Sequence, residues 1–169
     1  WHPEREWHFI GHLQTNKVKY IADKVTCIHS LESLKLAAEI DKQGAKVGRV
    51  IPCLLEINMA EEESKFGLSA TAAETFLREL APFSHILPKG LMTVAPAVAD
   101  PLQNRPIFCR MRQLLQQLQG LHLPNTDLTE LSMGMSNDYA VAVEEGATVV
   151  RLGTTIFGKR NYNQKETIL

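Results

Sequence analysis

The chain has 169 residues, of which 44% are hydrophobic and 22% are charged, and this composition is typical of one globular domain with a real core. Its net charge of −1, with acidic and basic residues interspersed, argues against nucleic acid as a partner. No apolar run is long enough to cross a bilayer, so no membrane partner is expected. Cys27, Cys53 and Cys109 are isolated in the sequence, which indicates reduced thiols in a cytoplasmic protein and not a zinc knuckle or a disulfide framework.

Short apolar strands and amphipathic helices alternate along the chain. The apolar runs predict strands over residues 7–10, 25–29, 50–58, 90–94, 128–133 and 148–153. Helices are predicted over 16–22, over 31–43, after Ser69 or Thr71, up to Gly120 and up to Gly146. The helix over 31–43 is expected to be capped by Ser30 and to stop at Gly44. The buried face of the helix that ends near Gly120 is expected to consist of Phe108, Met111, Leu115 and Leu118.

The last two predicted strands each run into a turn of Gly, Ser and Thr residues. Residues 131–138 (LSMGMSND) contain Ser132, Met135 and Ser136, and residues 149–158 (VVRLGTTIFG) contain Gly153 and Thr154. Backbone N–H groups in such turns, with hydroxyl groups beside them, form a nest for a phosphate. Because the two turns follow consecutive strands, we expect one shared anion site. Two ordinary strand-to-loop turns, with Ser136 acting only as a helix cap, are the alternative.

Six strand–helix units indicate a parallel sheet that is covered by helices. An open doubly wound sheet normally has its phosphate loop after the first strand, whereas a (β/α)₈ barrel has it after the last two strands. The phosphate signal lies at the end of this chain, which favours the barrel. A closed barrel needs eight strands and typically about 250 residues. We therefore expect residues 1–169 to form a single, partial barrel domain that lacks the first two strands.

Five segments carry a more specific pattern. They are residues 7–17 (WHFIGHLQTNK), residues 56–58 with 64–67 (EIN and SKFG), residues 89–92 (KGLM), residues 131–138 and residues 150–158. In this order they resemble the YggS/PROSC family of pyridoxal 5′-phosphate (PLP) homeostasis proteins. The resemblance implies a TIM-type barrel like the N-terminal domain of alanine racemase, with PLP at the C-terminal ends of the strands. In that family the Schiff-base lysine lies on the first barrel strand, and no segment of this sequence matches it.

Arg151 is the most informative candidate residue, because it interrupts the apolar run over 149–152, where an unpaired arginine is costly. The resemblance implies that Arg151 faces the pyridine nitrogen of PLP. A guanidinium group only donates hydrogen bonds, so that nitrogen would accept one and stay unprotonated. This arrangement weakens PLP as an electron sink. An internal salt bridge of Arg151 with Glu56 or Asp138 is the alternative.

The other candidates are more ordinary residues of the same strand ends. Asn58 ends a long strand and can approach the PLP ring, and His8 can line the pocket or be a core histidine. Lys65 can point toward the pocket or be an exposed lysine. Gly11 breaks any helix between His8 and His12, so no metal site is expected. The predicted cofactor-binding residues are Ser136, Arg151, Gly153, Thr154, Ser132, Met135, Asn58 and His8.

Together these features predict a cytoplasmic PLP-binding protein of PLP homeostasis, a carrier or regulator without strong turnover. Its expected partners are PLP and PLP-dependent apoenzymes, and at full length it is expected to be a monomer. A PLP-dependent racemase-like enzyme and a barrel enzyme for a phosphorylated metabolite are the alternatives. Racemases of this fold take a second base from a separate β-domain, whereas this chain ends nine residues after Arg160. No residue is assigned a catalytic role.

Overall fold

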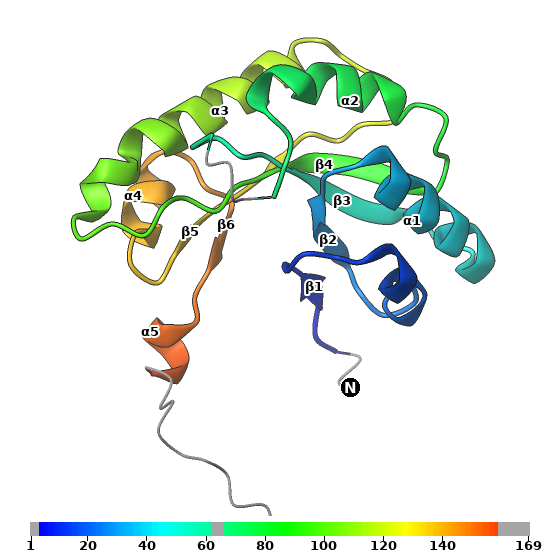
Figure 1. Ribbon diagram of the computed structural model, residues 1–169, viewed down its shortest axis with the longest axis horizontal. Helices are drawn as coiled ribbons and strands as arrows, with labels where there is room; N and C mark the ends of the chain where they lie inside the picture. The colour runs from blue at the N-terminus through cyan, green and yellow to red at the C-terminus, as the bar shows by residue number, and fades with distance from the viewer. Residues whose placement is uncertain (1–3, 62–65, 159–169) are drawn as a thin grey trace, which may run out of the picture.

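The computed structural model describes residues 4–61 and 66–158 of the chain. Within these residues, six parallel strands form one sheet in chain order, so each strand pairs with the one that follows it (Figure 1). The strands are β1 (His8–Phe9), β2 (Cys27–Leu31), β3 (Ile51–Glu56), β4 (Ile86–Met92), β5 (Glu130–Met135) and β6 (Val149–Arg151). A doubly wound sheet reverses its order at a switch point. The unbroken order therefore confirms the barrel-type architecture.

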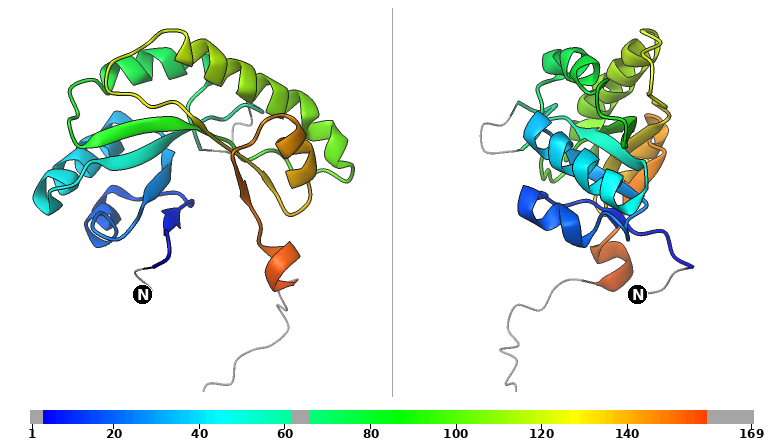
Figure 2. Two further views of the ribbon diagram at one scale, coloured as in Figure 1. Left: turned by 180° about the vertical axis from the view of Figure 1, so that it is seen from behind. Right: turned by 90° about the vertical axis from the view of Figure 1, so that its right-hand side faces the viewer.

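Helices cover the convex face of the curved sheet and leave the concave face free (Figures 1 and 2). The α-helices are α1 (Leu34–Val47), α2 (Ala73–Glu79), α3 (Arg105–Gln119), α4 (Tyr139–Glu144) and α5 (Thr154–Phe157). Three short 3₁₀ helices are η1 (Thr15–Tyr20), η2 (Ala70–Ala72) and η3 (Pro101–Asn104). Each predicted strand and helix is present, with ends that differ by a few residues from the sequence prediction.

The ends of α1 are the clearest correction. The N-cap is Ser33, whose hydroxyl accepts from Leu36 N at 3.3 Å, while Ser30 is buried within β2. The helix continues through Gly44 to Val47 and ends at Gly48, which has a left-handed φ of 65°. A Cβ at Gly44 would lie 2.8 Å from the His85 Cβ, so this glycine permits close packing and does not end the helix.

The main core lies between the sheet and its helices. The predicted face of α3 is confirmed, since its four apolar residues are all buried: Phe108, Met111, Leu115 and Leu118. Strand residues alternate between this core and the concave face. On the concave side, Cys27, Leu54 and Met92 form a small separate cluster, whereas Cys53 belongs to the main core. The helix-covered face is therefore the stable layer, and the concave face is left for polar groups.

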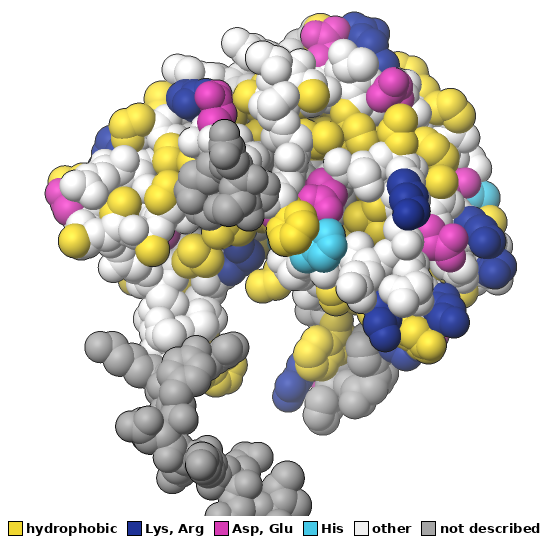
Figure 3. Space-filling model, viewed as in Figure 1, with side chains coloured by type: hydrophobic (Ala, Val, Ile, Leu, Met, Phe, Trp, Pro, Cys, Tyr) yellow, Lys and Arg dark blue, Asp and Glu magenta, His cyan; other side chains and the backbone are white. Residues whose placement is uncertain are grey.

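The concave side is open between β1 and β6, the two end strands of the sheet (Figure 1). The space-filling view shows a hollow between the N-terminal segment and α5 (Figure 3). The described residues thus form a partial barrel and not a closed one. Among them, no helix combines the length and the apolar character that a membrane span requires.

Candidate functional site

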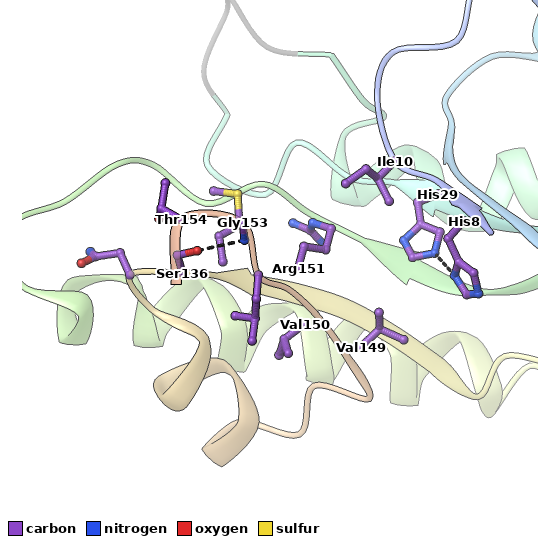
Figure 4. Close-up of a pocket in the computed structure, with 12 residues that line it drawn as sticks. His8, Ile10, His29, Ser136, Val149, Val150, Arg151, Gly153 and Thr154 are labelled. Atoms are coloured by element: carbon purple, nitrogen blue, oxygen red, sulfur yellow. Dashed lines mark hydrogen bonds between the residues drawn. The ribbon is translucent and has the colours of Figure 1, made fainter. Parts of the chain in front are cut away.

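A cavity of about 710 Å³ opens on the concave face, between β1–β2 on one side and β5–β6 on the other (Figure 4). It is lined by His8, Ile10, His29, Met135, Ser136, Asn137, Val149, Val150, Arg151, Leu152, Gly153 and Thr154. Parallel strands bring their C-terminal ends to the same edge of a barrel, which is where ligands bind in such folds. The two predicted anion-binding turns and the first strand therefore meet at a single cavity.

The two turns are joined directly by Ser136. Its hydroxyl oxygen accepts hydrogen bonds from the backbone N–H of Gly153 at 3.1 Å and of Thr155 at 3.3 Å. A Cβ at Gly153 would meet nothing within 4 Å, so the space on the Cα side of this residue is open. Asp138 fixes the other side of the turn by accepting from Met135 N at 2.7 Å. Two backbone donors thus converge on the Ser136 oxygen, which leaves the O–H of this exposed side chain to donate to an anionic oxygen.

Arg151 lies on the inner wall, between the Ser136–Gly153 hydrogen bond and the pair His8–His29 (Figure 4). Its guanidinium group donates to Ser132 Oγ and to the Thr93 carbonyl oxygen, each at 2.7 Å. Burial lowers the pKa of Arg151, while the charges of Asp138 and Glu56 act in the opposite direction. Among the described residues, no carboxylate lies within 4.0 Å of the guanidinium group. A guanidinium has five N–H donors, so donors remain for a ligand in the cavity.

A buried chain of hydrogen bonds continues from Arg151 to the far wall. Ser132 Oγ lies 3.0 Å from His29 Nδ1, and His29 Nε2 lies 2.8 Å from His8 Nδ1. Burial, followed by the charges of His8 and Arg151, lowers the pKa of His29 to about 4. His29 is therefore neutral near pH 7 and links the arginine to the second histidine without adding charge.

The structure brings most of the predicted site residues together. Six of the eight line the cavity, namely Ser136, Arg151, Gly153, Thr154, Met135 and His8. Ser132 lies directly beneath it as a fully buried partner of Arg151. Asn58 lies beyond the end of β3, outside the cavity wall, with its backbone N–H donating to the Leu68 carbonyl oxygen. Its role toward a ligand stays a prediction.

Two contributors to the site were missed in the sequence. His29 sits with Ser30 in a strand that is buried throughout, and this polar interruption was the available signal. Thr155 supplies the second backbone donor to Ser136, whereas the residue predicted from the sequence to bind the cofactor is its neighbour Thr154. Every residue except proline has a backbone N–H, so residue type does not show which N–H donates to Ser136. Only the geometry of the turn distinguishes the two threonines.

Residues 3–161 match the family model described as the alanine racemase N-terminal domain. A pyridoxal phosphate homeostasis protein from Aquifex aeolicus is 47% identical over 161 residues, an alignment that covers 93% of this chain and 68% of the relative. The chain belongs to the pyridoxal phosphate homeostasis protein family. The resemblance described in the sequence analysis is thereby confirmed.

Solved structures of a similar protein share the fold. PipY from Synechococcus elongatus PCC7942 without PLP aligns with a TM-score of 0.84 at 34% identity, covering 92% of this chain and 72% of PipY. PipY with PLP bound aligns with a TM-score of 0.82 at 33% identity and the same coverage. These similarities confirm a barrel of the alanine racemase type, of which the described residues of this family member contain six strands.

The chemistry of the lining residues can be compared with that of PLP, the compound in the family's name. The cavity combines apolar side chains, a guanidinium group with spare donors and a turn with converging N–H groups. These are the contacts that an aromatic ring, a ring nitrogen and a phosphate require. No lysine is among the twelve residues of the cavity wall, and Lys65 lies outside the described residues. The site therefore fits non-covalent binding of PLP.

Glu56 is a second partly buried charged residue on the concave side of the barrel. Burial, together with the neighbouring Glu32, raises the pKa of Glu56 from its ordinary 4.5 to about 6. The folded state thus binds this proton more tightly than the unfolded state. The contribution of Glu56 to stability is most favourable below pH 4.5 and falls as the pH rises to about 6.

We expect Glu56→Gln to stabilise the protein at pH 7, because it removes the cost of ionising a partly buried carboxyl group. The gain should be ~1 kcal/mol once solvent screening is included. Thermal unfolding of both proteins between pH 4 and pH 7.5 measures it. The difference should shrink toward acidic pH, and Glu79→Gln on the exposed side of α2 is the control, which should melt like the original chain at pH 7. Equal melting curves at pH 7 would contradict the assignment.

Proposed function

We propose that this chain binds PLP in the cavity between β1–β2 and β5–β6 and acts in PLP homeostasis as a carrier or regulator. The observation that carries this proposal is that Arg151 and the hydrogen-bonded pair of Ser136 and Gly153 line the same cavity. The names of the relatives and the PLP-bound PipY structure support it. We also infer that the protein is cytoplasmic, which is consistent with its three free cysteines.

Each end of the cavity has a separate task. The Ser136 hydroxyl would donate to the phosphate of PLP, beside the N–H groups of Gly153 and Thr155 that converge on its oxygen. Arg151 would direct a donor toward the ring nitrogen while Ser132 and the Thr93 carbonyl oxygen keep the guanidinium in place. The apolar side chains of Val149 and Val150 would exclude water from the ring.

The identity of the ring-nitrogen partner bears on turnover. Bound PLP supplies a reactive aldehyde and a pyridine ring that can accept electron density. Arg151 stays cationic even with a lowered pKa, because a guanidinium does not lose its proton in proteins. It therefore cannot take up a proton from the ligand or leave one on the ring nitrogen. This supports binding and delivery of PLP, with PLP-dependent apoenzymes as the proposed recipients, over carbanion chemistry.

We predict that Ser136→Ala weakens binding of PLP and of inorganic phosphate about ten- to hundredfold. Loss of a hydrogen bond to a charged group costs ~1.5–3 kcal/mol. The matched control is Ser69→Ala, which removes a hydroxyl that accepts from a backbone N–H at 3.2 Å outside the cavity. Thr154→Val tests the neighbouring hydroxyl in the same way.

Titration followed by PLP absorbance, with phosphate as competitor, measures both affinities. The Ser69→Ala protein should bind like the original chain. Unchanged affinity in the double variant Ser136→Ala, Thr154→Val would show that phosphate binds elsewhere and would reject this site.

A further inference from the structure

Three potential metal ligands come together on the concave face of β1 and β2. His8 pairs directly with Cys27 in the register of the two parallel strands. Cys27 and His29 are two residues apart in β2, so their side chains point to the same face of the sheet. One ligand atom from each of the three residues lies within 4.8 Å of the other two. In the described part of the chain, no other trio of His, Cys, Asp or Glu gathers in this way.

We propose that His8, Cys27 and His29 form a binding site for a zinc-like divalent cation. A thiolate and two imidazoles are the ligand types that Zn²⁺ prefers, and three protein ligands leave a fourth position for water. Cys27 and His29 are buried, with 6% and 1% of their surface exposed, whereas His8 is exposed at the cavity wall. The pair of buried ligands would hold the ion, and the His8 side offers a path of entry.

The surroundings of His29 support this role. Metal-bound histidines usually donate their second ring N–H to a neighbouring oxygen, which fixes the ring and leaves the other nitrogen free to bind. Ser132 Oγ lies 3.0 Å from His29 Nδ1 and is itself held by Arg151, so His29 Nε2 is the nitrogen that faces His8. The 2.8 Å contact between the two rings is the hydrogen bond that an ion would replace.

Binding of a divalent cation at this site changes the protonation of Cys27 alone. The positive charge of Arg151 is separated from the ligand atoms by the Ser132 hydroxyl, and the carboxylate of Glu130 acts on Cys27 from the other side. Cys27 is a buried, free thiol before the ion binds. Zn²⁺ forms a bond to sulfur, and the thiol proton passes to the solvent. Both imidazoles bind in their neutral form, so one proton is released for each ion.

This site goes beyond the proposed function: His8 and His29 also line the cavity, but the ion would use none of the donors of the Ser136–Gly153 turn. It also explains why the sequence predicts no metal site. The three ligands come from two strands, whose register pairs His8 with Cys27 although the two are far apart in the sequence, and they match no local spacing motif.

The test is a titration of the purified chain with Co²⁺, which reports both ligand type and geometry. We expect a thiolate-to-cobalt charge-transfer band in the near ultraviolet and intense visible bands typical of four-coordinate cobalt. Zn²⁺ should bleach both sets of bands at one equivalent. Cys27→Ser should abolish the near-ultraviolet band, and His8→Gln should weaken Co²⁺ binding at least about tenfold.

Cys53→Ser is the matched control, because Cys53 is buried on the neighbouring strand but faces the opposite, helix-covered side. It should retain the bands. If Cys27→Ser does not fold, His8→Gln decides, since its side chain is exposed and its loss leaves the core intact. The proposal is overturned if no charge-transfer band forms, if the band survives Cys27→Ser, or if Cys53→Ser removes it. It is also overturned if His8→Gln binds Co²⁺ as tightly as the original chain.

Discussion

Replacing Arg151 with glutamate is expected to reduce the affinity for PLP ~100-fold or more. The change removes donors to the ring nitrogen and places a carboxylate in a cavity that would hold an anion, and the loss corresponds to about 3 kcal/mol. It also leaves the buried carbonyl oxygen of Thr93 without its donor, which costs about 1–3 kcal/mol of stability. PLP that still binds should carry a protonated ring nitrogen and show a shifted absorbance spectrum.

Arg49→Gln provides the matched control for this prediction. Arg49 also donates to two backbone carbonyl oxygens, those of Ala22 and Val25, each at 3.0 Å, but it lies outside the cavity. This variant should melt at a lower temperature and bind PLP normally. Melting curves with and without PLP distinguish the two effects. If Arg151→Glu lowers stability equally in both conditions, with unchanged PLP affinity, then Arg151 has only a structural role.

The second large effect concerns the open side of the barrel. We expect residues 1–169 alone to self-associate and to retain no covalently bound PLP. In the described structure β1 and β6 each pair on one side only, and exposed edges of this kind favour pairing with another chain. Apolar side chains add to this tendency near the open side, where Ile10 is 50%, Ile156 is 64% and Phe157 is 85% exposed.

Adding the segment of the Aquifex aeolicus relative that lies outside the matched region should convert the assemblies into a one-to-one complex. Its melting temperature should rise by about 5 °C, because a few kcal/mol of new burial are gained. Sedimentation velocity at several concentrations, with a scrambled segment as control, measures the change. The prediction fails if the 169-residue chain is monomeric, melts cooperatively and gives a borohydride-trapped PLP adduct at one lysine.

Local patterns were sufficient for the elements themselves. The four buried residues of α3 follow from a period of 3.6, and β3 follows from a continuous apolar run; both patterns depend only on neighbours in the sequence. The N-cap of α1 was predicted incorrectly, because serine is a favourable capping residue and the sequence offers two, Ser30 and Ser33. The choice between them depends on how far β2 remains paired with β3, where Leu31 still lies opposite Leu55.

The sequence by itself determined the barrel-type alternation, the family, and the two turns that meet at the cavity. Only the tertiary structure decided the partners within the site. Arg151 reaches Thr93 across 58 residues, and His29 reaches Ser132 across 103. These contacts depend on strand register, on the irregularity between Ser132 and Met135, and on the curvature of the sheet. Such quantities belong to pairs of strands, and no pattern within one strand encodes them.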